Sequence, residues 1–254
     1  MFKTVAAESR DSHAWDLYAA ERADLHAFLA SLTPAQWNEP SLCEGWRVRD
    51  VAVHLLVDEP LEQLGVVRSF AKAATFKFSV HRINQWWITR NRERPVPEIV
   101  AAFDGPWHPG KISKMLGPGT GIRAAVIHHQ DMRRALGIPR VVPEERVRAA
   151  LDVVLTPRGS TNLGSCQRAA GLRLHADDID WSWGSAPEVT GPAEAILMAV
   201  AGRPAALADL YGEGLPVLAG RVTQPRGAGQ DAGPRSADLG RSRGDQFSAD
   251  PSGC

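Results

Sequence analysis

The chain has 254 residues, 44% of them hydrophobic, which is enough to bury the core of one large domain or of two ordinary ones. Lys and Arg together number 29, as do Asp and Glu, so the formal net charge is zero. A nucleic-acid binder usually carries a basic excess, and no apolar stretch approaches the ~20 residues of a membrane-spanning helix. The composition therefore predicts a globular protein that binds neither nucleic acid nor membrane.

Two features bear on the compartment in which the protein works. Residues 1–18 soon turn charged and lack the long apolar segment of a signal peptide. The three cysteines, Cys43, Cys166 and Cys254, are odd in number and widely spaced, which argues against a disulfide framework and for a reducing compartment. We therefore expect a cytoplasmic protein.

The first half of the chain shows the three-and-four spacing of hydrophobic residues that predicts amphipathic helices. The predicted helices cover residues 11–32, 47–64, 70–92, 95–103 and 120–136. Asp11 or Ser12 is expected to cap the first of them, and Gly137 to end the last. The segments 37–46 and 105–119 are rich in Pro and Gly and are expected to be loops.

After a further predicted helix at 143–155, the pattern of the sequence changes. Alternating residues predict short strands, and then helices resume. The predicted strands are 172–176, 181–183 and 187–190, and the predicted helices that follow are 193–201 and 205–210. Together the two halves predict a mainly α fold.

The domain organisation follows from this change of pattern. We expect a helical domain at 1–140 and a small α+β domain at 141–222. Residues 223–254 contain mostly Gly, Pro, Ser and charged residues and cannot bury enough surface to offset their ordering entropy. This tail is expected to be disordered.

Two histidines lie in the middle of predicted helices, where they can bind a metal. His54 shares a helix face with Asp58, and His128 shares one with Asp131. If the helices are neighbours in a bundle, both imidazoles can bind one divalent ion, whereas His129 lies about 100° round the helix and points elsewhere. A single histidine on an apolar face is more often a satisfied core residue, and no His-x-x-x-His motif is present. Spacing alone leaves both interpretations open.

Three separated segments carry more specific motifs. PSLCEGWRVRDVAVHLL combines a Leu-Cys-x-Gly-Trp turn with an apolar-His-Leu run, and IHHQDMRRALGIPR has a His-x-x-Asp-hydrophobic-Arg-Arg stretch. The third is LRLHADDIDWSWGSAPEVTGPAEAILMAVAGRPAALADLYGEG. In this order they resemble the mycothiol-dependent maleylpyruvate isomerase family of the DinB-like superfamily, over roughly residues 11 to 222.

The resemblance implies a fold, a metal and a thiol cofactor. It implies a DinB-like four-helix bundle followed by a small α+β domain, in a cytoplasmic protein of the actinobacterial type. His54 and His128 match the family's two metal-binding histidines, the metal being usually zinc, and the cofactor is mycothiol, which the metal presents as a thiolate. Arg203 matches an arginine that faces the family's active site, and is a candidate catalytic and cofactor-binding residue suited to a carboxylate. The alternative is that Arg203 only satisfies carbonyls at the end of the preceding helix.

The sequence departs from the family pattern at one metal ligand. The acidic ligand is expected four residues before the second histidine, where this chain has Ala124. Asp131 is a candidate replacement, both as metal ligand and as catalytic residue, because positions i and i+3 share a helix face. Alternatively, Asp131 orients His128 or pairs with Arg133 or Arg134. Asp58 is a weaker candidate for the missing ligand.

These observations leave three functions open. The first is a mycothiol-dependent, metal-assisted isomerase or thiol transferase that acts on a small electrophilic substrate, which can carry a carboxylate. The second is a non-catalytic metal- or ligand-binding protein with an incomplete site, and the third is an interaction or regulatory module. Cys43 is expected to be a buried structural thiol rather than a nucleophile, because no cationic residue is adjacent to it in sequence until Arg47. Monomer and homodimer both remain open.

Overall fold

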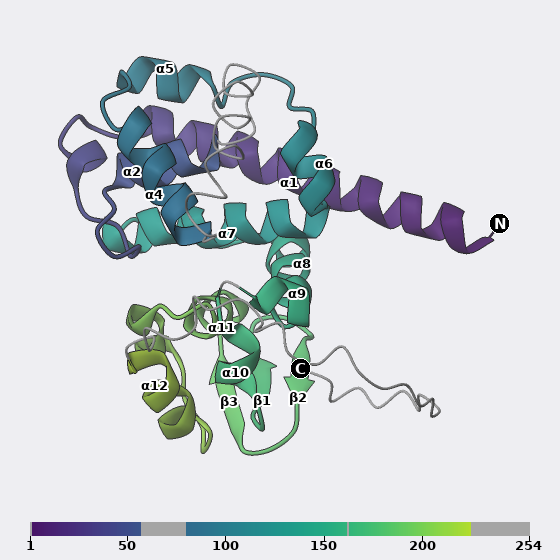
Figure 1. The fold of residues 1–254 in the computed structure, drawn as a ribbon. Helices are drawn as coiled ribbons and strands as arrows, with labels where there is room; N and C mark the ends of the chain where they lie inside the picture. Colours follow the sequence, from purple (N-terminus) through teal and green to yellow (C-terminus); the bar gives the residue numbers. More distant parts are fainter. Residues whose placement is uncertain (1, 57–79, 162, 225–254) are drawn as a thin grey trace, which may run out of the picture.

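A computed structural model describes residues 2–56, 80–161 and 163–224 of the chain. Helices make up most of this part, and one small sheet lies towards its C-terminal end (Figure 1). The described helices include none that is both long enough and apolar enough to cross a bilayer. The predicted mainly α fold, with a helical first half and a smaller α+β second half, is confirmed.

The first half of the chain forms a bundle around the long helices α1 and α7, which lie side by side (Figure 1). Its helices are α1 (Phe2–Ser31), η1 (Gln36–Asn38), α2 (Val48–Leu55), α4 (Val80–Asn91), α5 (Val96–Ala101), α6 (Lys111–Leu116) and α7 (Pro118–Ala135). Large apolar side chains such as Phe28, Trp37 and Trp87 fill the space between them. This core fixes α2 against α7, and the candidate site lies between these two helices.

The second half folds around a three-stranded sheet of order β2-β1-β3. Its elements are α8 (Glu144–Val154), α9 (Pro157–Ser160), α10 (Ser165–Ala169), β1 (Arg173–Ala176), β2 (Ser182–Gly184), β3 (Glu188–Gly191), α11 (Ala193–Val200), η3 (Pro204–Asp209) and α12 (Leu215–Thr223). The central strand β1 pairs antiparallel with β2 and parallel with β3, so that Leu174 lies opposite both Trp183 and Val189. Helix α11 packs on β1 and β3 and is buried along nearly its whole length.

One continuous hydrophobic core joins the two halves. It includes Ile122 and Val126 of α7, Leu151 of α8 and Leu197 of α11, together with the buried residues of the sheet. Helix α7 therefore packs against both halves, which is why most of its middle turns are buried. The predicted domain boundary at 140/141 falls beside this shared core and stays a prediction.

Several predicted elements are found close to their expected bounds. The helices expected at 120–136 and 143–155 are α7 and α8, and Gly137, with a φ of 65°, follows α7 in the left-handed conformation expected of a helix stop. The three expected strands and the helix expected at 193–201 are also confirmed. The helix expected at 205–210 is the 3-10 helix η3.

Other expectations are wrong. Helix α1 begins at Phe2, so that Asp11 and Ser12 lie inside it and neither caps it. The segment 105–119 is not wholly a loop, because α6 forms within it and α7 begins at Pro118, where the ring pre-sets the first helical turn. Helices α9, α10 and α12 were not predicted. They are short or rich in Gly and Pro, and tertiary packing outweighs their weak local signal.

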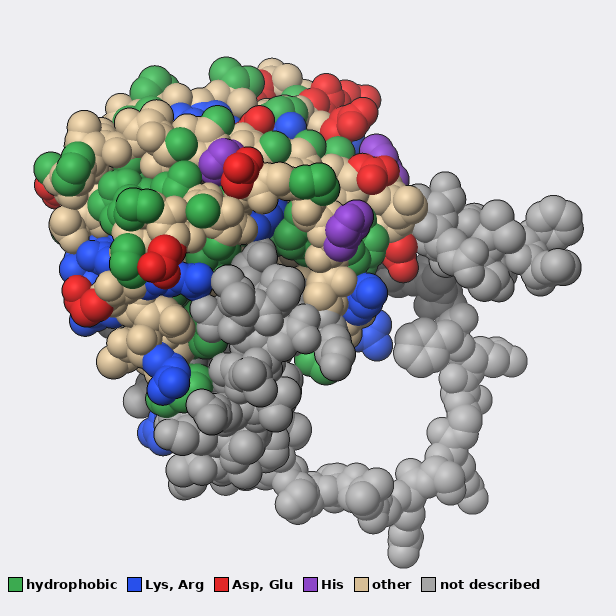
Figure 2. All heavy atoms as spheres, turned by 90° about the horizontal axis from the view of Figure 1, so that it is seen from above, with side chains coloured by type: hydrophobic (Ala, Val, Ile, Leu, Met, Phe, Trp, Pro, Cys, Tyr) green, Lys and Arg blue, Asp and Glu red, His purple; other side chains and the backbone are tan. Residues whose placement is uncertain are grey.

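Some predictions fall outside the described residues. These are residues 57–64 of the helix predicted at 47–64, residues 70–79 of the helix predicted at 70–92, the candidate ligand Asp58, and the tail from residue 225 onward. Figure 2 views the face on which α5 lies and shows acidic, basic and hydrophobic side chains interspersed over its described atoms.

Candidate functional site

Helix α7 brings His128 and Asp131 onto one face, because residues three positions apart lie one above the other on a helix. His128 Nδ1 lies 2.9 Å from Asp131 Oδ2. Asp131 is fully buried, whereas the His128 side chain keeps 16% of its surface exposed. The pair therefore combines a buried charge with a partly accessible imidazole.

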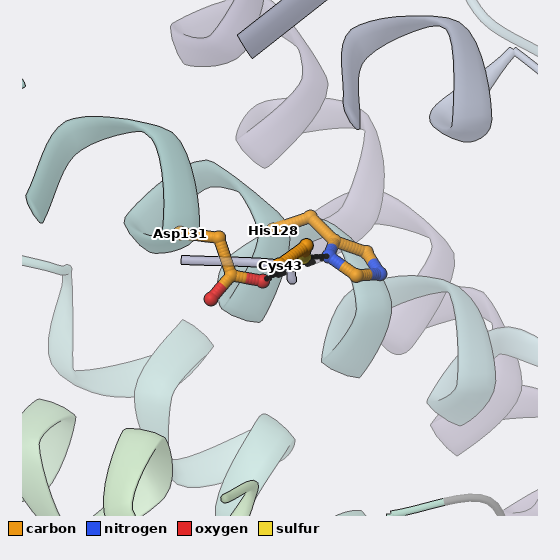
Figure 3. Close-up of side chains that lie close together, drawn as sticks. All are labelled: Cys43, His128 and Asp131. Atoms are coloured by element: carbon orange, nitrogen blue, oxygen red, sulfur yellow. Dashed lines mark hydrogen bonds and ion pairs between the residues drawn. The ribbon is translucent and has the colours of Figure 1, made fainter. Parts of the chain in front are cut away.

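The loop between η1 and α2 places Cys43 on this pair (Figure 3). The backbone of Ser41 and Trp46 closes a tight turn, and the Ser41 hydroxyl accepts a hydrogen bond from the Cys43 amide at 3.1 Å. The Leu42 amide donates to the backbone carbonyl of Asp131 at 3.1 Å, which ties the loop directly to α7. As a result the Cys43 thiol donates to Asp131 Oδ2 at 3.0 Å and lies 3.6 Å from His128 Nδ1.

The segment after α11 adds a cation to this cluster. Arg203 donates from Nε to Asp131 Oδ1 at 2.8 Å and from a terminal nitrogen to Oδ2 at 2.7 Å, a two-pronged ion pair. The same terminal nitrogen lies 3.7 Å from Cys43 Sγ. Gly202, with a φ of 89°, allows the chain to leave α11 towards α7. Arg203 also donates to the carbonyl of Ala201 at 2.7 Å, so it serves the helix end as well as the site.

These contacts set the charge of Asp131 and Cys43. Burial would raise the pKa of Asp131, but Arg203 and the hydrogen bond from His128 outweigh it and hold that pKa well below its ordinary value. Burial and the neighbouring Asp131 raise the pKa of the Cys43 thiol far above its ordinary value, and Arg203 opposes them only in part. The cluster therefore contains an ionised carboxylate, a guanidinium and a neutral thiol.

The ionised carboxylate also fixes the tautomer of His128. An ionised carboxylate only accepts hydrogen bonds, so the proton between His128 Nδ1 and Asp131 Oδ2 belongs to Nδ1. The lone pair of His128 is then on Nε2. This is the arrangement by which a carboxylate orients a histidine that binds a metal through its other nitrogen.

His54 of α2 approaches His128 from the facing helix. The two ring centres are 5.0 Å apart at an interplanar angle of 87°, and Trp46 packs on the His54 ring at 5.1 Å. His54 Nδ1 is buried and has no hydrogen-bond partner among the described residues. Burial and the nearby His128 lower the pKa of His54 to about 3, against the opposing effect of Asp131, so its imidazole is neutral at neutral pH.

The structure therefore brings together all four residues that the sequence singled out. His54, His128, Asp131 and Arg203 meet between α2, α7 and the end of α11. The carboxylate of Asp131 binds His128 and Arg203, rather than Arg133 or Arg134 as one alternative had it.

Cys43 is the member of the cluster that sequence reasoning missed. The nearest basic residue to Cys43 in sequence is Arg47, four positions on, but Arg203, 160 residues away, supplies the cation in space. The Leu-Cys-x-Gly-Trp motif was the one signal that could have pointed to it. Ala124, at the position of the expected acidic ligand, is half-buried and offers no donor atom in its side chain.

His129 points away from the site, as expected. It is fully buried, its Nδ1 lies 2.9 Å from Glu21 of α1, and Arg133 donates to its Nε2 at 2.8 Å. Arg140 and Arg146 also pair with Glu21. This network holds α1 to α7 on the side of the helix away from Cys43.

The donors present fit a divalent ion. With Zn–N bonds of about 2.0–2.1 Å, two imidazoles on one tetrahedral zinc have ring centres roughly 5 Å apart, which matches the 5.0 Å between His54 and His128. The unpartnered Nδ1 of His54 and the oriented imidazole of His128 both suit metal binding. Among the described residues, however, His54 does not join the tighter group of Cys43, His128 and Asp131, whose ligand atoms all lie within 4.8 Å of one another.

Comparison with known proteins agrees with this architecture. Residues 18–108 match the family model of the mycothiol maleylpyruvate isomerase N-terminal domain. The crystal structure of a mycothiol-dependent maleylpyruvate isomerase variant, with a histidine replaced by alanine, superposes with a TM-score of 0.52 at 14% identity, covering 80% of this chain and 92% of that one. The crystal structure of the mycothiol-dependent maleylpyruvate isomerase gives 0.50 at 16% identity, covering 76% and 89%. At this identity the likeness establishes the fold. Among curated proteins, none matches the chain.

Proposed function

We propose that the protein is a thiol-dependent isomerase or transferase assisted by a divalent metal, zinc, because residues 18–108 match the N-terminal domain model of the mycothiol maleylpyruvate isomerase family and the chain has the fold of that enzyme. The substrate class is a small electrophile, and the thiol is of the mycothiol type. The observation that carries the proposal is the His128–Asp131 pair facing the unpartnered His54 across two helices.

Each residue of the cluster has a role in this proposal. His54 and His128 would hold the ion, the first as a neutral imidazole and the second through Nε2. Asp131 accepts the Nδ1 proton of His128 and keeps that ring in one orientation. A divalent ion bound there supplies Lewis acidity, which favours the thiolate form of a thiol that reaches it.

Arg203 is the proposed site for a carboxylate group of the substrate. Its guanidinium has five N–H donors, and Asp131, Ala201 and Cys43 already engage four of them. A substrate carboxylate must therefore share Arg203 with Asp131. This sharing would position the substrate beside the thiol without leaving either charge unpaired.

The second candidate is a non-catalytic metal- or ligand-binding protein on the same scaffold. The specific observation in its favour is Ala124, which removes the expected acidic ligand and leaves two histidines, whereas catalytic zinc usually has three protein ligands. The two candidates differ in turnover and not in metal binding.

The test is metal content followed by turnover, on protein purified without chelator or a histidine tag. We expect roughly one zinc ion per chain in the wild type and none in the His54→Ala, His128→Ala double variant. A matched control is the His13→Ala, His108→Ala double variant, which removes two exposed histidines that do not belong to the cluster and should keep the metal.

Turnover then separates the two candidates. Conversion of maleylpyruvate that needs both mycothiol and the bound metal would support the enzyme. Metal binding with no thiol-dependent turnover would favour the binding protein. Absence of metal after incubation with zinc would overturn the metal-assisted enzyme and the metal-binding form of the second candidate.

A further inference from the structure

The Nδ1 side of His128 carries a second set of metal donors. Cys43 Sγ, His128 Nδ1 and Asp131 Oδ2 are separated by 3.6, 3.0 and 2.9 Å (Figure 3). With metal–ligand bonds of about 2.0–2.3 Å, the donor atoms of one tetrahedral zinc are roughly 3.3–3.8 Å apart. Small outward shifts of these three side chains would therefore make a triangle that one ion can cap.

We propose that Cys43, His128 and Asp131 form a metal position of their own, selective for thiophilic ions such as Zn²⁺ or Cd²⁺. It shares His128 with the site proposed above, but it needs Cys43 and does not need His54. A thiolate ligand favours soft ions over Mg²⁺ or Ca²⁺, so this position would differ from the two-histidine site in the ions it accepts.

Charge favours this position for a buried divalent ion. Between His54 and His128 an ion meets neutral nitrogen donors, whereas on the Nδ1 side it meets the Asp131 carboxylate and a thiol that can become a thiolate. Two negative ligands offset the charge of the ion, which is otherwise costly to bury. Asp131 can keep Oδ1 for the Nε of Arg203 while Oδ2 turns to the ion.

The three donors are held in place before any ion arrives. His128 and Asp131 sit one turn apart on α7, and the backbone bond from Leu42 to the Asp131 carbonyl fixes the Cys43 loop to the same turn. The Ser41 hydroxyl accepts from the Cys43 amide. Ligands fixed by a supporting hydrogen-bond network lose little conformational entropy on binding an ion.

Ion binding here moves two protons. Cys43 Sγ gains a bond to the ion and releases its proton to solvent, and His128 binds through Nδ1 once its proton has moved to Nε2. The Nε2 lone pair is then no longer available to an ion on the His54 side. The two positions are therefore alternatives, and each chain holds an ion at one or the other.

Cobalt(II) spectroscopy separates the two positions. A sulfur-to-cobalt charge-transfer band in the near ultraviolet requires a thiolate ligand, whereas visible ligand-field bands report any tetrahedral site. We expect the charge-transfer band in the wild type and in His54→Ala, and its loss in Cys43→Ser. The Cys166→Ser, Cys254→Ser double variant leaves Cys43 as the chain's one cysteine and should keep the band.

Three results would overturn the inference, and they differ in what they say of the proposed function. Ligand-field bands without charge transfer would place the ion on the two histidines and leave the proposed function standing. Loss of the band in both His54→Ala and Cys43→Ser would show one shared site in place of two positions. Circular dichroism first checks that each protein is folded. If none of the folded proteins bound cobalt, the thiolate position and the metal-assisted function would both be overturned.

Discussion

Asp131 is a fully buried carboxylate that accepts hydrogen bonds from Cys43, His128 and both prongs of Arg203. Replacing it with Asn keeps the shape but leaves the guanidinium without its counter-charge. Because breaking a buried ion pair from one side is costly, we expect Asp131→Asn to lower the free energy of unfolding by about 3–5 kcal/mol. Urea denaturation at neutral pH measures this loss.

A matched control for this substitution is Asp16→Asn, which changes an exposed aspartate of α1. Its effect should stay within about 0.5 kcal/mol. If the two variants unfolded at the same urea concentration, the ion pair with Arg203 would contribute nothing to stability.

Glu21 gives the protein a pH dependence of its own. Burial would raise the pKa of Glu21, but hydrogen bonds from His129 and Arg140 outweigh it and lower that pKa from 4.5 to about 2. A carboxyl group whose pKa is lower in the folded state stabilises the fold above its unfolded pKa, and this contribution is lost as pH falls through the folded value. The contribution is roughly 3 kcal/mol when complete.

We therefore expect the stability difference between wild type and Glu21→Gln to be constant above about pH 5 and to shrink steadily between about pH 4.5 and pH 2. Chemical denaturation of both proteins at a series of pH values measures it. A difference that stayed the same from pH 6 down to pH 3 would contradict the assignment of a low pKa to Glu21.

At the scale of elements, helices α7 and α11 are joined by a network of ion pairs and hydrogen bonds that runs from their buried contact to the surface. Arg134 of α7 donates from Nε to Glu194 of α11 at 2.8 Å and also pairs with Asp209, while Gln130 donates to the same Glu194 oxygen at 2.8 Å. Since α11 leads directly to Arg203, this contact positions the guanidinium against α7.

Neutralising this contact should loosen the two helices. We expect Glu194→Gln to reduce the free energy of unfolding by about 2 kcal/mol, because the charge-assisted hydrogen bonds between Arg134 and Glu194 are weakened. Thermal unfolding followed by circular dichroism measures the change. Glu213→Gln, an exposed glutamate in the turn before α12, serves as the control and should leave the melting temperature unchanged.

Elements whose signals are local could be predicted from the sequence. Helix α7 has an apolar face and a Gly stop, and β1 alternates buried residues with more exposed ones. His128 and Asp131 were correctly paired because they lie on one helix. The start of α1 was misplaced because residues 2–10 carry no clear apolar stripe, so that nothing local marked Phe2 as the beginning.

Long-range contacts could not be predicted in the same way. The contact between Cys43 and Asp131 depends on how a loop docks on α7. The contacts of Arg203 with both residues depend on the packing of α11. No periodicity or charge pattern in the adjacent residues indicates either contact. The resemblance to a known family placed Arg203 at the site, whereas for the thiol the Leu-Cys-x-Gly-Trp motif was the one signal.

At the scale of the whole molecule, the core shared by α7, α8 and α11 couples the two halves. We expect Leu151→Ala, a truncation of a fully buried side chain in α8, to lower stability by about 2–5 kcal/mol. Because the core is continuous, both halves should unfold in one transition whose calorimetric and van't Hoff enthalpies agree.

The control for this truncation is Leu116→Ala, which alters a side chain that is 53% exposed at the end of α6. Its melting temperature should match that of the wild type. Two separate heat-capacity peaks in Leu151→Ala, one for each half, would show that the halves fold independently and that the shared core does not couple them.

The spacing of the site's residues along the chain also sets the order and the interval in which they are synthesised. Asp131 precedes Arg203 by 72 residues, so at about 5–20 residues per second the ribosome adds the arginine roughly 4 to 14 seconds after the aspartate. During that interval the nascent chain already contains the thiol and the carboxylate, but not the guanidinium that pairs with them in the finished protein. A metal ion present while the chain is being made can therefore meet these two groups before their own counter-ion has been added.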